Sequence, residues 1–166
     1  MSHLKDDFAR VAEVNLVYRN KVKAPDRPQV ATSRAAYALF LDTWDMDKIE
    51  LQEQFRIMLL DRGNKCMGIS TVATGGMSAC LVDSKIIFSL ALKARATAII
   101  LAHNHPSGQV KPSLEDKRLT DRLARIGELL ELPVLDHLVV ALHDYTSFAD
   151  EGLFLTASPE MKMTGG

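Results

Sequence analysis

Cysteine is scarce in this sequence, and long apolar runs are absent. Only two of the 166 residues are cysteines, Cys66 and Cys80, and they form no Cys-x-x-Cys pair. This usage is typical of a reduced protein in which a cysteine is more often a small buried residue than a metal ligand. No apolar run approaches the roughly 20 residues needed to span a bilayer. Residues 1–13 also lack the apolar core of a signal peptide. We therefore expect a cytoplasmic protein with no membrane-spanning segment.

Neither sign of charge is in excess. The formal net charge is −1 and the isoelectric point is about 6.5. The chain as a whole therefore has no bulk attraction to nucleic acid or to an anionic membrane, although a local basic patch is compatible with this balance. The length fits one domain with a substantial core. Hydrophobic residues at 47% and charged residues at 25% are typical of a globular protein.

The chain divides into three segments. Residues 1–48 are predicted to form an N-terminal extension, residues 49–155 the main metal-binding domain, and residues 156–166 a flexible tail. In the extension we expect a strand over 12–18, a basic linker with Pro25 and Pro28 over 19–32, and a helix capped by Ser33 that runs to about Trp44.

Strand and helix patterns alternate through the main domain. The pattern predicts a hairpin of strands 53–60 and 66–74, a helix from Asp83 or Ser84 through Lys93, a buried strand over 98–102, an amphipathic helix over 113–131, and strands over 134–142 and 145–148. This interleaving indicates an α/β or α+β fold with a mixed sheet.

Two histidines follow the buried central strand. His103 and His105 are two residues apart, so in extended chain their imidazoles point to the same side. The turn that Pro106 begins can bring the start of the next helix, with Ser113 and Asp116, back over them. Two nitrogens and one carboxylate oxygen, with a fourth position open to water, are typical of a catalytic zinc site.

Glu53 opens the strand before this site. It shares a strand face with Phe55, Ile57 and Leu59, whereas Glu50 lies an odd number of residues away and is expected to point elsewhere. A carboxylate on an inward apolar face is costly unless something compensates it. A water activated by a nearby metal would do so.

Each residue also has a structural interpretation. A histidine at a strand end is often only hydrogen-bonded, and Ser113 with Asp116 also fits a capping box in which the carboxylate binds backbone amides and no metal. His137 is either a hydrogen-bonded core residue or a residue that supports a ligand.

The complete pattern is more specific than its parts. His-x-His, seven residues, Ser, two residues and Asp, with an upstream Glu, resembles the signature of JAMM/MPN metalloproteases. The chain also has the segments His-Asn-His-Pro-Ser-Gly at 103–108 and Leu-Asp-His at 135–137. With these segments it resembles the RadC family, which carries a DNA-repair label. The resemblance covers roughly residues 49–155. Asn104 differs from it, since the proteases usually have Ser or Thr between the histidines.

The resemblance implies a single JAB/MPN-like domain, a mixed sheet flanked by helices with a metal site at the sheet edge. It implies that His103, His105 and Asp116 bind Zn²⁺, that Glu53 is the general base, and that Ser113 stabilises the developing oxyanion. The expected activity is hydrolysis of an amide, peptide or isopeptide bond in an unknown protein or peptide substrate.

Two further classes compete with a zinc hydrolase. The chain could be a nucleic-acid or repair-complex binding module with zinc as a structural element. The basic segment with Arg19, Lys21, Lys23 and Arg27 favours this, and the net charge opposes it. Two histidines and one carboxylate also suit a non-haem iron site. A zinc deaminase is disfavoured, because the His-x-Glu and Pro-Cys-x-x-Cys elements are absent.

Overall fold

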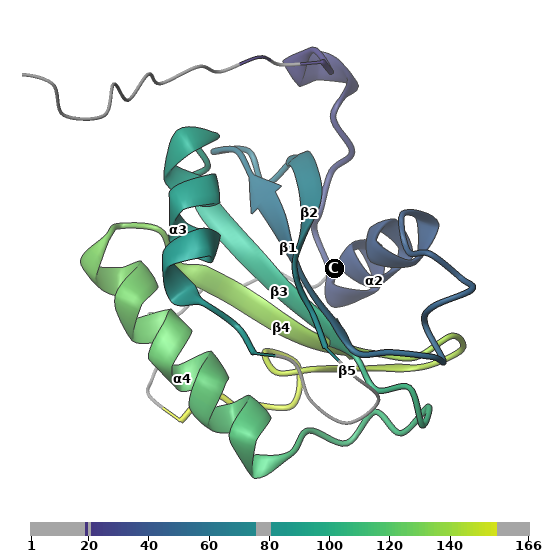
Figure 1. The fold of residues 1–166 in the computed structure, drawn as a ribbon. Helices are drawn as coiled ribbons and strands as arrows, with labels where there is room; N and C mark the ends of the chain where they lie inside the picture. The colour runs from purple at the N-terminus through teal and green to yellow at the C-terminus, as the bar shows by residue number, and fades with distance from the viewer. Residues whose placement is uncertain (1–18, 20, 76–80, 156–166) are drawn as a thin grey trace, which may run out of the picture.

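The residues that the structure describes form one mixed five-stranded sheet with helices on both faces (Figure 1). The computed structural model describes residues 19, 21–75 and 81–155. Their elements are a 3₁₀ helix η1 (Ala24–Asp26), then α2 (Ser33–Asp42), β1 (Gln54–Leu60), β2 (Cys66–Thr74), α3 (Ser84–Lys93), β3 (Ala98–Asn104), α4 (Leu114–Leu129), β4 (Val134–Val140) and β5 (Tyr145–Ser147). The sequence prediction of an α/β or α+β fold is confirmed. The strand expected at 12–18 and the expected tail at 156–166 lie outside the described residues.

The strand order β2-β1-β3-β4-β5 places β3 at the centre of the sheet. β3 is parallel to β4, and the pairs β1–β2, β1–β3 and β4–β5 are antiparallel. Every residue of β3 is buried, which agrees with its continuous apolar sequence. β3 continues two residues beyond the predicted end at Ala102 and therefore includes His103.

β1 and β2 form the predicted hairpin. Asp61 fixes its turn, because its Oδ1 accepts hydrogen bonds from the backbone amides of Gly63 at 2.9 Å and Lys65 at 3.0 Å. Asn64 takes a positive φ of 55°, which asparagine tolerates better than most residues. β1 begins at Gln54, one residue later than predicted, so Glu53 stands just before the strand.

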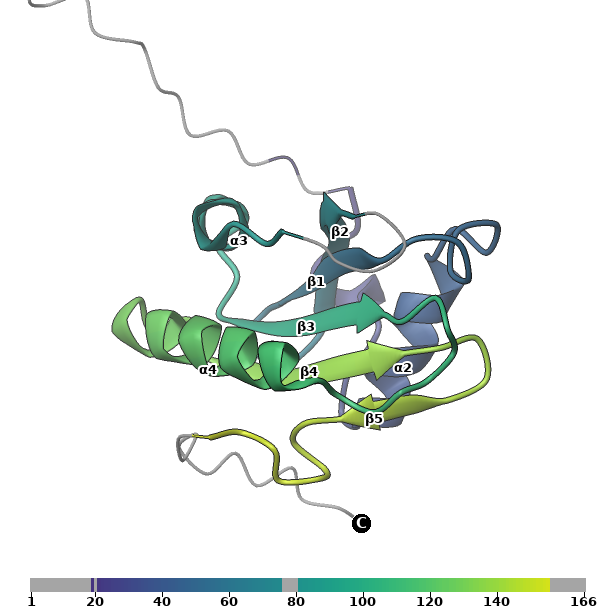
Figure 2. The ribbon, with the colours of Figure 1, turned by 60° about the horizontal axis from the view of Figure 1, so that its bottom comes forward.

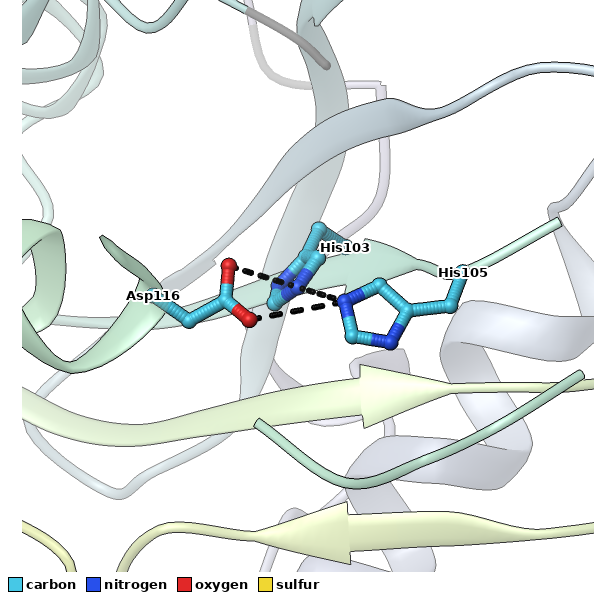
Figure 3. A group of neighbouring side chains, drawn as sticks. All are labelled: His103, His105 and Asp116. Carbon is cyan, nitrogen blue, oxygen red and sulfur yellow. Dashed lines mark hydrogen bonds and ion pairs between the residues drawn. The ribbon is translucent and has the colours of Figure 1, made fainter. Parts of the chain in front are cut away.

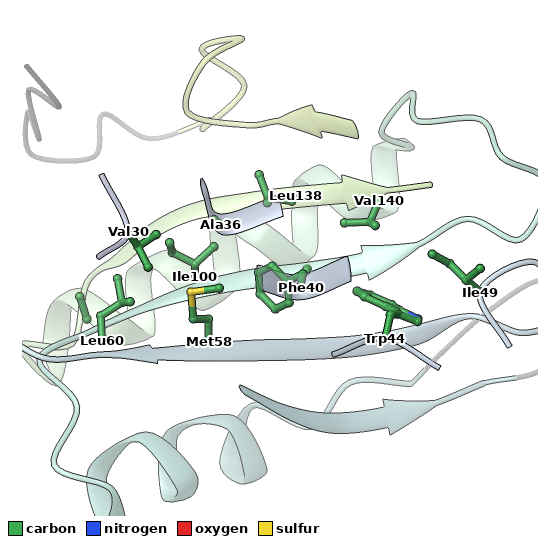
Figure 4. Packing of buried hydrophobic residues seen from close by; sticks show 12 residues of the cluster. Val30, Ala36, Phe40, Trp44, Ile49, Met58, Leu60, Ile100, Leu138 and Val140 are labelled. Carbon is green, nitrogen blue, oxygen red and sulfur yellow. The ribbon is translucent and has the colours of Figure 1, made fainter. Parts of the chain in front are cut away.

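One face of the sheet packs on α2. Its core includes Phe40 and Trp44 from the α2 region, Met58 from β1 and Leu138 from β4 (Figure 4). The predicted cap Ser33 is wrong: Thr32 is the N-cap, since its side chain accepts a hydrogen bond from the amide of Ala35 at 3.1 Å.

Ser33 makes a longer-range contact. Its hydroxyl donates to the carboxylate of Asp150 at 2.5 Å, across 117 positions of sequence. The helix also ends at Asp42, before the predicted end near Trp44.

The opposite face packs on α3 and α4 (Figures 1 and 2). The sequence predicts that α3 starts at Asp83 or Ser84. Asp83 is the N-cap of α3, because its side chain accepts a hydrogen bond from the amide of Lys85. Leu123 and Ala124 of α4 lie in the core between the helix and the sheet. Figure 2 shows the chain leaving the carboxyl end of β3 and returning to the start of α4. No helix in the described part of the chain is long and apolar enough to cross a membrane.

Candidate metal centre

Three side chains meet where β3 ends and α4 begins. His103 Nε2 lies 3.0 Å from His105 Nε2 and 3.2 Å from Asp116 Oδ1. His105 Nε2 lies 3.4 Å from the other carboxylate oxygen of Asp116. Figure 3 shows the carboxylate facing both imidazole rings. The structure thus brings together the three predicted ligand residues, which come from positions up to 13 residues apart.

The backbone orients His105. Its Nδ1 lies 2.7 Å from the carbonyl oxygen of Gln109. A carbonyl oxygen only accepts, so Nδ1 of His105 must carry the hydrogen. The turn between them is closed by the Gly108 amide, which donates to the carbonyl of His105 at 2.9 Å, and Gly108 has a φ of 78° that favours glycine. The Nε2 of His105 is therefore directed at Asp116 and His103.

Asp116 also belongs to a capping box. Its Oδ2 accepts a hydrogen bond from the amide of Ser113 at 2.7 Å, and Ser113 Oγ accepts one from the amide of Asp116 at 3.1 Å. An ionised carboxylate offers about four lone-pair directions. The capping interpretation and the ligand interpretation are therefore compatible, because the cap leaves lone pairs directed at the two histidines.

The charges of these groups depend on one another. Burial acts to raise the pKa of Asp116, but the nearby imidazoles of His103 and His105 outweigh it and hold that pKa well below its ordinary value. The ionised Asp116 in turn raises the pKa of His105, against the opposing effect of burial. In the absence of a cation the cluster therefore favours a proton on His105, which a metal ion must displace on binding.

The donor set fits a small tetrahedral cation. Ligand atoms about 2.0–2.2 Å from a tetrahedral zinc lie about 3.3–3.6 Å from one another. The two histidine nitrogens lie 3.0 Å apart, and each lies 3.2 or 3.4 Å from one of the two carboxylate oxygens of Asp116, so the three side chains are close enough to share one small cation. Two imidazole nitrogens and one carboxylate oxygen leave a fourth position for water, as in catalytic zinc sites.

A cavity of about 720 Å³ adjoins this cluster. Glu53 and Ser113 line it together with His103, His105 and Asp116. The predicted alternation of β1 is confirmed, since Phe55 and Ile57 face the core on this side of the sheet. The rest of the wall includes Phe55, Leu81, Val82, Pro106, Ser107, Glu115, Leu119 and Arg122.

Glu53 is fixed in position from both sides. Its carbonyl oxygen accepts a hydrogen bond from the amide of Gly75 at 2.8 Å. Asn104 holds the residues around it: its Oδ1 accepts from the amide of Gln54 at 2.7 Å, and its Nδ2 donates to the carbonyls of Ile49 at 2.6 Å and Gln52 at 2.9 Å. Sequence reasoning treated Asn104 only as a departure from the protease pattern. The residue clamps the segment that carries Glu53.

His137 lies directly behind the cluster and is completely buried. Its Nε2 is 2.8 Å from His103 Nδ1, and its Nδ1 is 2.5 Å from the hydroxyl of Thr120. His137 is therefore a buried core residue that also contacts His103, one of the candidate ligands. Burial lowers the pKa of His137 well below its ordinary value.

Thr120 was missed by sequence reasoning. Its spacing of four from Asp116 could have indicated it, because residues four apart share a helix face.

The cysteines take no part in the cluster as far as the structure describes them. Cys66 is half-buried and packs against the core beneath α2. Cys80 lies outside the described residues.

The fold and the cluster define an α/β domain with a two-histidine, one-aspartate candidate metal site at the carboxyl end of its central strand. Residues 30–153 match the model of the RadC-like JAB domain, and the chain belongs to that family. The resemblance inferred from the motif is confirmed.

Similar bacterial proteins are known. A UPF0758 protein of Flavobacterium johnsoniae is 40% identical over 102 residues, which are 61% of this chain and 44% of that protein. A UPF0758 protein of Symbiobacterium thermophilum is 45% identical over 101 residues, 61% of this chain and 43% of that protein. UPF0758 protein YkfG of Escherichia coli is 41% identical over 102 residues, 61% of this chain and 65% of that protein. The matches thus span less than half the length of the first two relatives, and none of these names describes an activity.

Proposed function

We propose that this chain is a zinc-dependent hydrolase of amide, peptide or isopeptide bonds. One observation carries the proposal: Glu53 and Ser113 line the same cavity as the cluster of His103, His105 and Asp116. A purely structural metal site needs no carboxylate and hydroxyl beside an open ligand position.

His103, His105 and Asp116 would hold the zinc. When bound, the metal supplies a Lewis acid that makes water a better nucleophile and polarises a carbonyl group. Zinc suits these nitrogen and oxygen donors in a tetrahedral arrangement. Non-haem iron shares this donor set, so the metal content of the purified protein distinguishes the two metals.

Glu53 moves the proton. Its carboxylate accepts a proton from the attacking water as the new carbon–oxygen bond forms. It then gives that proton to the leaving nitrogen as the carbon–nitrogen bond breaks. The clamp by Asn104 on the segment around Glu53 supports this role, because a general base must be held within hydrogen-bonding distance of its proton.

Ser113 stabilises charge on the reacting oxygen. Its Oγ already accepts the capping hydrogen bond from the amide of Asp116. A hydroxyl both accepts and donates, so the Ser113 hydrogen is available for an oxygen in the cavity. Because the cap fixes the Oγ, this donor is oriented before substrate arrives.

A library of peptides and isopeptides, incubated with zinc-loaded protein, tests the proposal. Cleavage by the wild type and its loss in Glu53→Gln would support it. Glu50→Gln is the matched control, because Glu50 is exposed and does not line the cavity. Cleavage that persists in Glu53→Gln, or that disappears equally in Glu50→Gln, would contradict the assigned role.

A nucleic-acid binding module is the second candidate, and one observation favours it. A second cavity of about 820 Å³ is lined by Arg27, Arg62, Lys65 and Arg95. It lies near the amino end of β3, so it is at the opposite end of the sheet from the cluster. Arg27 is neutralised by Asp61 at 2.8 Å, which leaves three cations to attract phosphate. Binding of a labelled oligonucleotide that weakens in Arg62→Ala would favour this function.

A further inference from the structure

A continuous series of hydrogen bonds runs from α4 through β4 to β3 behind the metal cluster. The Thr120 hydroxyl donates to the carbonyl oxygen of Asp116 at 2.6 Å and lies 2.5 Å from His137 Nδ1. His137 Nε2 lies 2.8 Å from His103 Nδ1. All three side chains are buried, with Thr120 and His103 each 1% exposed and His137 fully enclosed. No proton in this series is therefore shared freely with bulk water.

The direction of each hydrogen bond follows from counting donors. The single hydrogen of the Thr120 hydroxyl goes to the Asp116 carbonyl, which can only accept. Thr120 Oγ1 must then accept from His137, so His137 carries its hydrogen on Nδ1. A fully buried imidazolium beside a second histidine is costly, so His137 is neutral and its Nε2 accepts. His103 must therefore donate from Nδ1.

The aromatic neighbours hold both rings at these angles. Phe55 stacks against His103 with an interplanar angle of 9°, and Phe148 stacks against His137 at 20° with ring centroids 4.9 Å apart. Phe55 also meets the ring of His137 edge-on, with centroids 5.4 Å apart. Rotation of either ring to exchange its nitrogens would disrupt this packing.

The geometry points to Thr120 and His137 as positioning residues that fix His103 as the Nδ1–H tautomer, with the Nε2 lone pair aimed at the metal position before any metal binds. The inference rests on the metal site of the proposed function. Neither residue touches the metal position. They act through His103, as the Gln109 carbonyl acts on His105. In both imidazoles the hydrogen bond at Nδ1, on the side away from the metal position, fixes the tautomer.

The metal-free wild-type protein provides the first test. Long-range proton–nitrogen correlation spectra of the imidazole rings distinguish the two tautomers directly. We expect Nδ1–H for both His103 and His137 before zinc is added. The Nε2–H tautomer at either residue would overturn the inference, and this measurement depends on no variant folding correctly.

Two substitutions at one position provide the second test. Thr120→Val keeps the shape of the side chain but removes the acceptor for His137 Nδ1–H. Moving the hydrogen of His137 to Nε2 then avoids a buried N–H donor without an acceptor. His103 must in turn accept at Nδ1 and carry its own hydrogen at Nε2. Thr120→Ser retains the hydroxyl and is the matched control. Loss of an outer hydrogen bond of this kind typically weakens metal binding by about 10–100-fold.

Zinc affinity, measured by competition with a chelator, is the readout. We expect the loss in Thr120→Val and near wild-type affinity in Thr120→Ser, with the histidine tautomers changing only in the valine variant. Wild-type affinity in Thr120→Val, or an equal loss in both variants, would overturn the inference. The measurement needs no substrate, so a wild type that binds zinc but cleaves nothing would refute the hydrolase and leave this inference supported.

Discussion

Glu53→Gln should separate metal binding from catalysis. The side chain lines the cavity but is not one of the three residues whose donor atoms converge, so the variant should keep its zinc. Glutamine is nearly the same size and still hydrogen-bonds a water, but it cannot take a proton. A general base typically contributes about 10²–10⁴-fold to the rate. This corresponds to about 2.7–5.4 kcal/mol of activation free energy.

The assay combines two measurements on the same preparation. Zinc content is compared with the rate of cleavage of a substrate identified from the peptide and isopeptide library. Asp116→Asn is the contrasting variant, because it replaces a charged donor that faces both histidines and should therefore weaken zinc binding itself. If Glu53→Gln loses zinc as readily as Asp116→Asn, then Glu53 is a ligand and the reasoning fails. If cleavage is unchanged, the base lies elsewhere.

Three further predictions concern stability and binding. Asn104→Ala removes three hydrogen bonds to buried or half-buried backbone groups. The free energy of unfolding, measured with urea, should therefore fall by about 1–3 kcal/mol or more. An unchanged free energy of unfolding would refute the clamp. Burial raises the pKa of Asp136 to about 6, above its ordinary 3.8. The contribution of the protonated Asp136 side chain to the free energy of unfolding is therefore complete at low pH, and it is lost as the pH rises through 6. Relative to Asp136→Asn, the wild type should lose up to about 3 kcal/mol of unfolding free energy between about pH 4 and about pH 8, and a parallel pH dependence of the two proteins would contradict this. Fluorescence anisotropy should detect no tight, sequence-independent binding to duplex DNA at physiological salt, given the net charge of −1; sub-micromolar affinity that falls steeply with salt would overturn this expectation.

Local periodicity was sufficient to predict most of the fold. The buried strand β3, the β1–β2 hairpin and the amphipathic helix α4 each have a hydrophobic pattern that matches a single type of secondary structure. The errors arose at element ends. Thr32 and Ser33 are both acceptable caps, and the choice depends on the partner that Ser33 finds at Asp150, which local sequence does not reveal.

The candidate site was predictable where its residues are close in sequence. The convergence of His103, His105 and Asp116 follows from a strand end, a turn and a helix start within 14 residues. The supporting contacts were not predictable in this way. The hydrogen bond between His103 and His137 joins residues 34 positions apart, and Asn104 reaches back 52 positions to Gln52. Such contacts depend on sheet register, and β3 is buried along its whole length, so it has no alternating pattern that would fix its register.

The capping box illustrates a different limit. From sequence alone, a helix cap and a metal ligand are alternative roles for Asp116. In the folded protein one carboxylate contacts the amide of Ser113 and both imidazoles. Counting lone pairs, which needs only the chemistry of the side chain, would have shown that the roles can coexist.

The metal content of protein purified without added metal tests the central claim most directly. Elemental analysis of the wild type should find about one zinc per chain, the number that one set of three protein ligands can hold. The double variant His103→Ala/His105→Ala should contain almost none, because it retains a single one of the three converging donors. A wild type that contains iron or manganese in place of zinc, or a double variant that retains the wild-type amount of zinc, would contradict the account.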